Sequence, residues 1–140
     1  MHLELVTLRG KKVDQEIYEV TIPTENGPIA VFPSHQAHVT LAVPGALAIR
    51  HQKDDSDDKL EYLAITGGVV KIADNVVRIL VDEADHSEEI LEEESKAALE
   101  RAMELKKNAK SELELEKALD LMDRHAVRLK VAGLRRRKRG

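Results

Sequence analysis

The first 84 residues alternate between short apolar runs and turn residues. Each run is short enough for one β-strand, and Gly, Pro, Asn and Ser separate neighbouring runs. The runs cover residues 3–8, 16–22, 29–32, 39–43, 46–50, 60–65, 69–72 and 76–81. Eight short strands at this spacing predict an antiparallel β-sandwich or barrel.

After residue 84 the apolar period lengthens to that of an α-helix. Residues 85–110 consist of helix formers, with glutamates near the start and lysines at the end, which complements the helix dipole. Asp85 and Glu88 are a plausible cap for this helix, and Ser111 with Glu114 forms a capping box for a second one. The sequence therefore predicts an α+β chain, with an antiparallel β-sandwich domain over 1–84 and an antiparallel two-helix hairpin over 85–140.

The facing stripes of the two predicted helices are rich in alanine. They contain Leu91, Ala98, Ala102 and Leu105 in the first helix, and Leu115, Ala118, Leu119, Met122, Ala126 and Leu129 in the second. Since burial contributes about 25 cal/mol per Å², small alanine side chains predict weak docking. A weakly docked hairpin of this kind is able to detach from the surface on which it packs and to bind a different surface.

Composition narrows the chemistry that the chain can perform. Its 22 basic and 26 acidic side chains give a formal net charge of -4, so there is no overall attraction to nucleic acid. It has no cysteine, which excludes disulfides and thiolate metal sites. We find no secretory signal and no run of about 18 apolar residues, so we expect no direct membrane insertion.

Two local features are candidates for chemistry. His35 and His38 are three residues apart, but on a strand or turn such side chains point to opposite faces, and no cysteine or nearby acid completes a ligand set. The other feature is the basic run 135–139, which fits a solvated end, a site for an acidic protein, or a site for nucleic acid or anionic lipid. We predict no catalytic residue, no metal and no cofactor, although a small metal-dependent enzyme built on the two histidines stays an alternative.

Residues 63–84 resemble the signature of the epsilon subunit of F-type ATP synthases. They read LAITGGVVKIADNVVRILVDEA, with a small apolar strand, Thr, Gly-Gly, a strand, Asn, and a strand that ends in an acidic-Ala segment. Residues 26–35, NGPIAVFPSH, are similar to the family's EGELGILPGH, although Pro28 replaces a carboxylate and Ala30 and Ser34 replace glycines. The resemblance covers nearly the whole chain, including the two-helix tail.

This resemblance implies a non-catalytic rotor subunit. The sandwich is implied to bind the gamma subunit and to lie near the membrane ring of c subunits, with His35 as the ring contact. The hairpin is implied to inhibit ATP hydrolysis by placing its second helix among the alpha and beta subunits. The implied contacts there are Arg124, Arg128, Lys130, Arg135, Arg136 and Arg137. The resemblance also implies that the chain lies peripherally on the cytoplasmic face of a bacterial inner membrane, and a plastid origin is the alternative.

Some bacterial members of this family bind ATP through Ile or Leu-Asp-x-x-Arg-Ala at the start of the first helix. Residues 90–95 read ILEEES here, so Leu91 stands in place of Asp and Glu94 in place of Arg. Arg101, Arg124 and Arg128 match further basic positions of that site. Because the charge at Glu94 is reversed and opposes phosphate, we expect no ATP binding.

Gly67 and Gly68 interrupt the most strand-like segment of the chain. They predict a tight corner or a close approach of the facing chain within the sandwich, and a simple hairpin turn is the alternative. The competing functional hypothesis for the whole chain is a free-standing adaptor whose basic tail binds nucleic acid.

Overall fold

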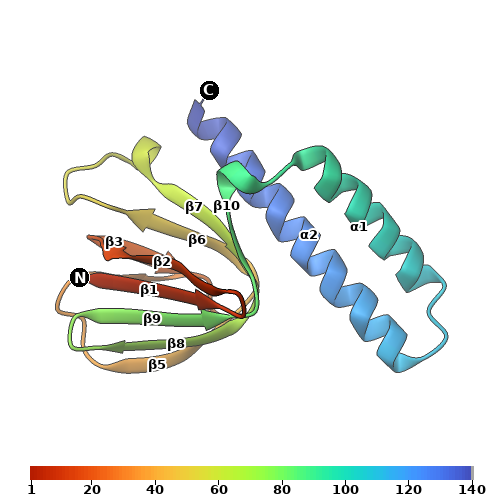
Figure 1. The fold of residues 1–140 in the computed structure, drawn as a ribbon, viewed down its shortest axis with the longest axis horizontal. Helices are drawn as coiled ribbons and strands as arrows, with labels where there is room; N and C mark the ends of the chain where they lie inside the picture. The colour runs from red at the N-terminus through yellow and green to blue at the C-terminus, as the bar shows by residue number, and fades with distance from the viewer. Residues whose placement is uncertain (140) are drawn as a thin grey trace.

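Two five-stranded sheets face each other in the amino-terminal part of the chain (Figure 1). This computed structural model describes residues 1–139, with side chains as far as Arg135. The first sheet has the order β2 (Gly10–Glu16), β1 (His2–Thr7), β9 (Val76–Val81), β8 (Gly68–Ala73) and β5 (His38–Ala42). The second sheet has the order β10 (Ala84–His86), β7 (Glu61–Ile65), β6 (Gly45–Arg50), β3 (Glu19–Ile22) and β4 (Ile29–Val31). The predicted sandwich is confirmed.

Strand pairing follows the predicted antiparallel pattern at every pair except one. β1 pairs in parallel with β9, because the amino-terminal strand inserts between β2 and the later β9. The β8–β9 hairpin turns at Asp74 and Asn75, whose φ values of 53° and 63° are those of a tight two-residue hairpin turn. The predicted run 16–22 corresponds to β3, which begins at Glu19, and β2 (Gly10–Glu16) lies outside the predicted runs except for Glu16.

Alternation along the strands places one apolar face of each sheet inside. Leu3 lies opposite Val77 in the β1–β9 pair, and Leu5 lies opposite Ile79. All four side chains are fully buried, together with Leu47, Ile49 and Leu63 from the second sheet. The core is therefore aliphatic, as the low aromatic content predicts.

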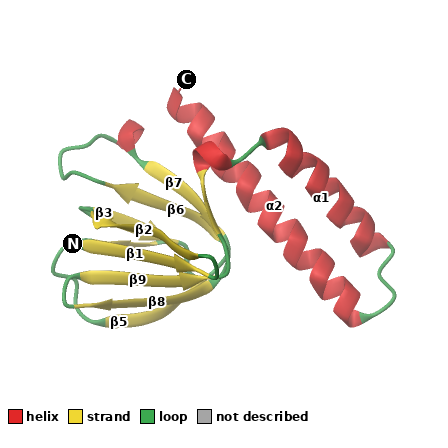
Figure 2. Cartoon of the chain, viewed as in Figure 1, coloured by secondary structure: helices red, strands yellow, loops and turns green. Residues whose placement is uncertain are grey.

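A two-helix hairpin follows the second sheet (Figure 2). The first helix, α1 (Glu92–Lys107), begins later than predicted, because β10 and a short 3₁₀ turn, η2 (Ser87–Glu89), use the preceding residues. The cap proposed at Asp85 is therefore wrong. A second 3₁₀ turn, η1 (Asp57–Lys59), lies in the loop between β6 and β7.

The second helix, α2 (Glu112–Arg139), begins at the predicted capping box. The Ser111 hydroxyl accepts a hydrogen bond from the Glu114 amide at 3.1 Å, while the Glu114 carboxylate accepts one from the Lys110 amide at 2.7 Å. This arrangement satisfies two of the free amides near the helix start. No helix in the described part of the chain is both long enough and apolar enough to span a bilayer.

The hairpin leans away from the sandwich and contacts it mainly through α2 (Figure 1). Ile90, Val131 and Ala132 are buried there against Ala64 of β7, with Val127 partly buried beside them. The predicted stripes are only partly correct, since Ala102 and Ala118 are buried between the helices but Leu91 and Leu105 are 58% and 54% exposed. Ala126, Leu115 and Leu119 are also exposed. The hairpin thus keeps apolar side chains in solvent.

Candidate functional site

Gly68 lies where β8 and β9 come very close together. A Cβ built at this position would be 1.9 Å from the Leu80 carbonyl oxygen, and one at Gly67 would be 3.2 Å from the Ala42 carbonyl oxygen. Neither glycine has a positive φ, so a turn conformation does not require them. The close approach of backbone atoms explains why this strand segment contains glycine.

An exposed apolar row crosses the outer face of the first sheet. Leu41 lies opposite Val69, and Val69 lies opposite Leu80, so three adjacent strands place apolar side chains next to each other. Their exposed fractions are 64%, 42% and 48%, and that of Val39, two residues before Leu41, is 65%. We call these four residues the apolar row. Contiguous exposed apolar groups of this kind mark protein interaction surfaces.

His35 lies in the turn before β5, at the end of the sandwich where the β8–β9 hairpin also turns. The Ser34 amide donates a 3.0 Å hydrogen bond to the Asn75 side chain, which ties the two turns together. His35 Nδ1 lies 2.7 Å from the Gln36 carbonyl oxygen, and the His35 and His38 rings are 6.5 Å apart. Among the described residues no group of three or more His, Cys, Asp or Glu side chains is arranged to hold a metal ion.

The candidate basic residues of α2 fall into two groups. Arg124 Nη1 lies 3.5 Å from Glu83 Oε1, and Arg128 Nη1 lies 3.7 Å from Asp85 Oδ2. Arg135, farther along α2, donates to the Ser87 carbonyl oxygen. Lys130 is exposed, and the side chains of Arg136 and Arg137 lie outside the described part of the structure. The helix therefore directs three of its arginines toward the segment that leads out of the sandwich.

His125 lies between the two helices next to these arginines. Its Nδ1 atom is buried without a hydrogen-bond partner among the described residues. Burial lowers the pKa of the His125 imidazole, and the positive charges of Arg128, Arg124 and Arg101 lower this pKa further. The lowered pKa favours the neutral imidazole at neutral pH.

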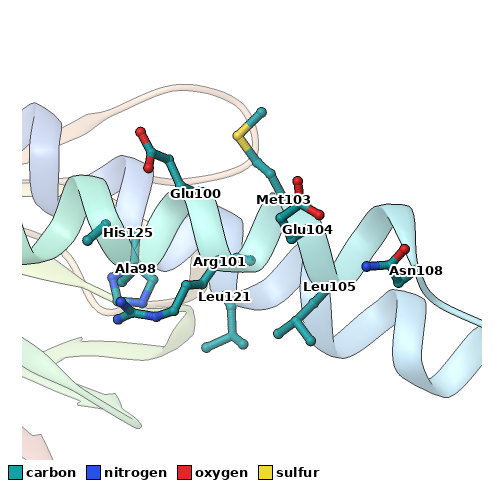
Figure 3. A pocket seen from close by; sticks show the side chains of 11 residues that line it. Ala98, Glu100, Arg101, Met103, Glu104, Leu105, Asn108, Leu121 and His125 are labelled. Atoms are coloured by element: carbon teal, nitrogen blue, oxygen red, sulfur yellow. The ribbon is translucent and has the colours of Figure 1, made fainter.

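A groove of about 990 Å³ runs along the seam between α1 and α2 (Figure 3). It exists because Ala97, Ala98 and Ala102 are too small to fill the space between the helices. Arg101 and Leu121 point to the same side of the hairpin in Figure 3, whereas Met103 points away. The groove is largely apolar, and its polar lining consists of Glu100, Glu104, Arg101, Asn108 and His125.

A smaller cavity of about 420 Å³ adjoins this groove at the start of α1. Arg101 and Arg128 line it together with His125, and so does Glu94, whose carboxylate the sequence placed where ATP-binding relatives have an arginine. The negative charge thus lies in the same cavity as the two guanidinium groups. The expectation that ATP does not bind stays a prediction.

Comparison with known proteins identifies the family. The model of the ATP synthase delta/epsilon chain β-sandwich domain matches residues 1–87. The ATP synthase epsilon chain of Trichlorobacter lovleyi is 32% identical over 139 residues, covering 99% of this chain and 97% of that one. The epsilon chain of Herpetosiphon aurantiacus is also 32% identical, over 136 residues, with 97% and 96% covered.

Solved structures agree with this match. A chain in the mitochondrial ATP synthase of Euglena gracilis, solved with its F1 part and c-ring, superposes with a TM-score of 0.76 and 26% identity, covering 94% of this chain and 79% of that one. A chain from the central stalk and c-ring of the Tetrahymena thermophila enzyme has the same fold, with a TM-score of 0.59 and 19% identity, and covers 93% and 94%. From its sandwich, its two-helix hairpin and these matches, the chain belongs to the epsilon-chain family of ATP synthases, which are stalk subunits and not the catalytic ones.

Proposed function

We propose that this epsilon chain couples the catalytic part of an ATP synthase to the membrane ring, and that its α2 helix inhibits ATP hydrolysis. The observation that carries the coupling role is the apolar row on the outer face of the first sheet. Burying one Leu or Val side chain completely contributes about 1.5–3 kcal/mol. Four adjacent side chains on a rigid sheet therefore give a gamma subunit a firm attachment surface.

The turn that contains His35 is our candidate contact with the ring of c subunits. It is tied to the β8–β9 turn through Asn75, so its backbone is held in one position. Pro28 has no carboxylate to pair with a basic group of the ring. The contact between this turn and the ring therefore relies on hydrogen bonds of the His35 imidazole. The charge interaction with the ring is weaker than in relatives that have a carboxylate at this position.

The carboxyl-terminal half of α2 is our candidate inhibitory element. Residues 124–139 contain eight Lys and Arg side chains and no Asp or Glu. The named contacts are Arg124, Arg128, Lys130 and Arg135 to Arg137, and their partners are acidic surfaces of the alpha and beta subunits. Such a helix can reach them only if it leaves the sandwich, which a small docking contact permits.

The location we propose is the cytoplasmic face of a bacterial inner membrane, where the chain is held through the ring and not by insertion. The full-length similarity to bacterial epsilon chains supports this location. The membrane contact is then indirect.

The experiment uses the full chain and a cognate alpha-beta-gamma complex. Leu41→Asp combined with Leu80→Asp places two charges in the apolar row, and the affinity for the complex should fall at least about 100-fold, because each buried unpaired charge costs several kcal/mol. Leu8→Asp is the matched control, because Leu8 is 84% exposed and lies outside the row. Equal affinities for the row variant and the control would reject the apolar row as the attachment surface.

Inhibition is measured in the same system as the rate of ATP hydrolysis. The wild-type chain should lower the rate, and a chain with Arg124→Gln, Arg128→Gln and Lys130→Gln should bind equally well but inhibit less. If the wild-type chain binds the complex and leaves hydrolysis unchanged, α2 has no inhibitory role.

A further inference from the structure

Two arginines of α2 lie beside the strand that leads out of the sandwich, and their spacing matches that strand. Arg124 is near Glu83 and Arg128 is near Asp85. Four residues of helix rise about 6 Å, and two residues of strand rise about 6.6 Å. Helix and strand therefore run side by side in register over both pairs. We call Glu83, Asp85, Arg124 and Arg128 the latch.

Beyond the latch, α2 continues along the same segment of the chain as far as Ser87. Arg135 donates to the carbonyl oxygen of Ser87, and Ser87 is buried under α2. Alternate residues 83, 85 and 87 of this segment thus all contact the helix. Ala84, between them, is buried in the core of the sandwich. The segment has one face for the sandwich and one for α2.

The latch pairs are incomplete as ion pairs. Their N···O distances of 3.5 and 3.7 Å exceed the 2.7–2.9 Å that is usual for a charge-assisted hydrogen bond. The Nε atoms of Arg124 and Arg128 are buried and have no hydrogen-bond partner among the residues that the structure describes. Each guanidinium therefore keeps bonding capacity that the docked state leaves unused.

Arg50 shows what a complete arginine site looks like in the same chain. Its Nε lies 2.7 Å from Glu19 Oε1, its Nη2 lies 2.7 Å from Asp57 Oδ1, and its Nη1 donates to the Asp55 carbonyl oxygen at 2.6 Å. All three nitrogens are used. A structural ion pair is thus built differently from the latch.

We propose that Glu83 and Asp85 act as an internal competitor, which holds Arg124 and Arg128 in the docked state until an acidic surface of a partner replaces them. This inference rests on the inhibitory role proposed for α2. Acidic side chains of the partner take the place of Glu83 and Asp85. The two arginines therefore exchange one carboxylate for another and are never left without a charge partner. The latch thus regulates inhibition by setting how much of the chain has a free α2.

The chain is suited to a direct test because it has no native cysteine. Lys53→Cys in the β6–β7 loop and Glu116→Cys on α2 are exposed positions for two spin labels or fluorophores. The distance distribution of the full chain then reports the ratio of docked to undocked hairpin. Glu83→Gln with Asp85→Asn should lower this ratio about tenfold, given a few-fold effect per pair.

The matched control is Glu88→Gln with Glu93→Gln. It removes the same two negative charges near the start of the hairpin, but both side chains are exposed and lie outside the latch. The control should keep the wild-type ratio. Raising the salt concentration from 0.05 to 1 M should release the wild-type hairpin and have little further effect on the latch variant. Equal ratios in the latch variant and the control would overturn the inference.

Swapping the charges of residues 124 and 83 distinguishes a lost ion pair from a variant that fails to fold. Arg124→Glu alone should undock α2, and Arg124→Glu combined with Glu83→Arg should restore most of the docking. Restoration requires that the two side chains act on each other. If the double exchange is as undocked as the single variant, Glu83 does not hold Arg124 and the inference is wrong.

The hydrolysis assay separates this inference from the proposed function. With the alpha-beta-gamma complex, the Glu83→Gln and Asp85→Asn variant should inhibit at an about tenfold lower concentration than wild type. If it undocks but inhibits no better than wild type does, the competitor role is wrong. If the ratio of docked chain does not respond while wild type still inhibits, the latch is wrong and the proposed function stands. If the latch responds and no form of the chain inhibits, the proposed inhibition is wrong.

Discussion

Substituting Gly68 with alanine should destabilise the sandwich strongly. The new Cβ would lie 1.9 Å from the Leu80 carbonyl oxygen and 2.9 Å from both the Leu80 carbonyl carbon and Val81 Cγ1. Contacts shorter than 3.0 Å are essentially absent for real Cβ atoms, so β8 and β9 must separate by about 1 Å at this point. Both strands are in the middle of the first sheet, where Val81 pairs with Gly68 itself.

The magnitude follows from what blocks the added methyl group. Extra atoms in a packed interior cost about 1–3 kcal/mol, and the upper end applies here because a backbone carbonyl cannot rotate away as a side chain can. We expect a loss of about 3 kcal/mol in the free energy of unfolding. At about 3 °C per kcal/mol for a chain of this size, the melting temperature should fall by about 10 °C.

Gly67→Ala is the matched control, since it adds the same methyl group one residue earlier. Its Cβ would be 3.2 Å from the Ala42 carbonyl oxygen, a contact that a small shift relieves, so the loss should be about 1 kcal/mol or less. Urea unfolding of the full chain, followed by circular dichroism, measures both. If the two variants have equal stability within about 0.5 kcal/mol, backbone approach does not explain Gly68.

Three further predictions concern charge and ligands. The hydrogen bonds that His2 donates to Asp14 and then to Glu16 raise the pKa of His2, and they lower the pKa of both carboxyl groups. The stabilisation from these hydrogen bonds should therefore be fully present between the ordinary carboxyl and imidazole pKa values, about pH 4.5 to 6.5. It should fade as pH rises through the raised pKa of His2 or falls through the lowered pKa values of the carboxyl groups. Thermal melts of wild type and His2→Gln should differ most in this range, and a difference that grows toward pH 9 would contradict the assignment. Calorimetry with ATP should show no saturable binding at millimolar concentration, because the negative charge of Glu94 lines the same cavity as Arg101 and Arg128, and clear binding would reject this expectation. Replacing Arg136 and Arg137 with Gln should leave affinity for the gamma subunit unchanged; salt-sensitive DNA or RNA binding that this change abolishes would instead favour the nucleic-acid adaptor.

The sandwich could be predicted from sequence because its signals are local. Alternation with period two fixes which side chains of β1, β8 and β9 face inward, and turn residues such as Asn75 fix where the chain reverses. The cap at Ser111 is local in the same way: its hydroxyl accepts from the Glu114 amide as predicted, and the Glu114 carboxylate reaches back to the amide of Lys110, one residue before the cap. In each case a few neighbouring residues determine the outcome.

The docking face of α2 could not be predicted for the opposite reason. Val127, Val131 and Ala132 are no more apolar than Leu115 and Leu119, yet the first three pack on the sandwich and the last two are 37% and 39% exposed. The choice depends on where β7 and η2 lie in space. β10 is not predictable in this way, because Ala84–His86 is a three-residue strand between Glu83 and Ser87 and gives no period of its own.

Few contacts hold the hairpin on the sandwich. Its buried contact with the sandwich contains two large apolar side chains, Ile90 and Val131, each contributing about 1.5–3 kcal/mol at most, and partly exposed ion pairs add about 0–1 kcal/mol each. Moving a two-state equilibrium from 1:99 to 99:1 takes about 5.5 kcal/mol of differential binding. A partner that offers α2 an acidic surface, and covers leucines such as Leu113 and Leu119 that are exposed now, can supply free energy of this size. The small apolar contact with the sandwich and the incomplete arginine pairs thus keep the docked and free states close enough in free energy for a partner to choose between them.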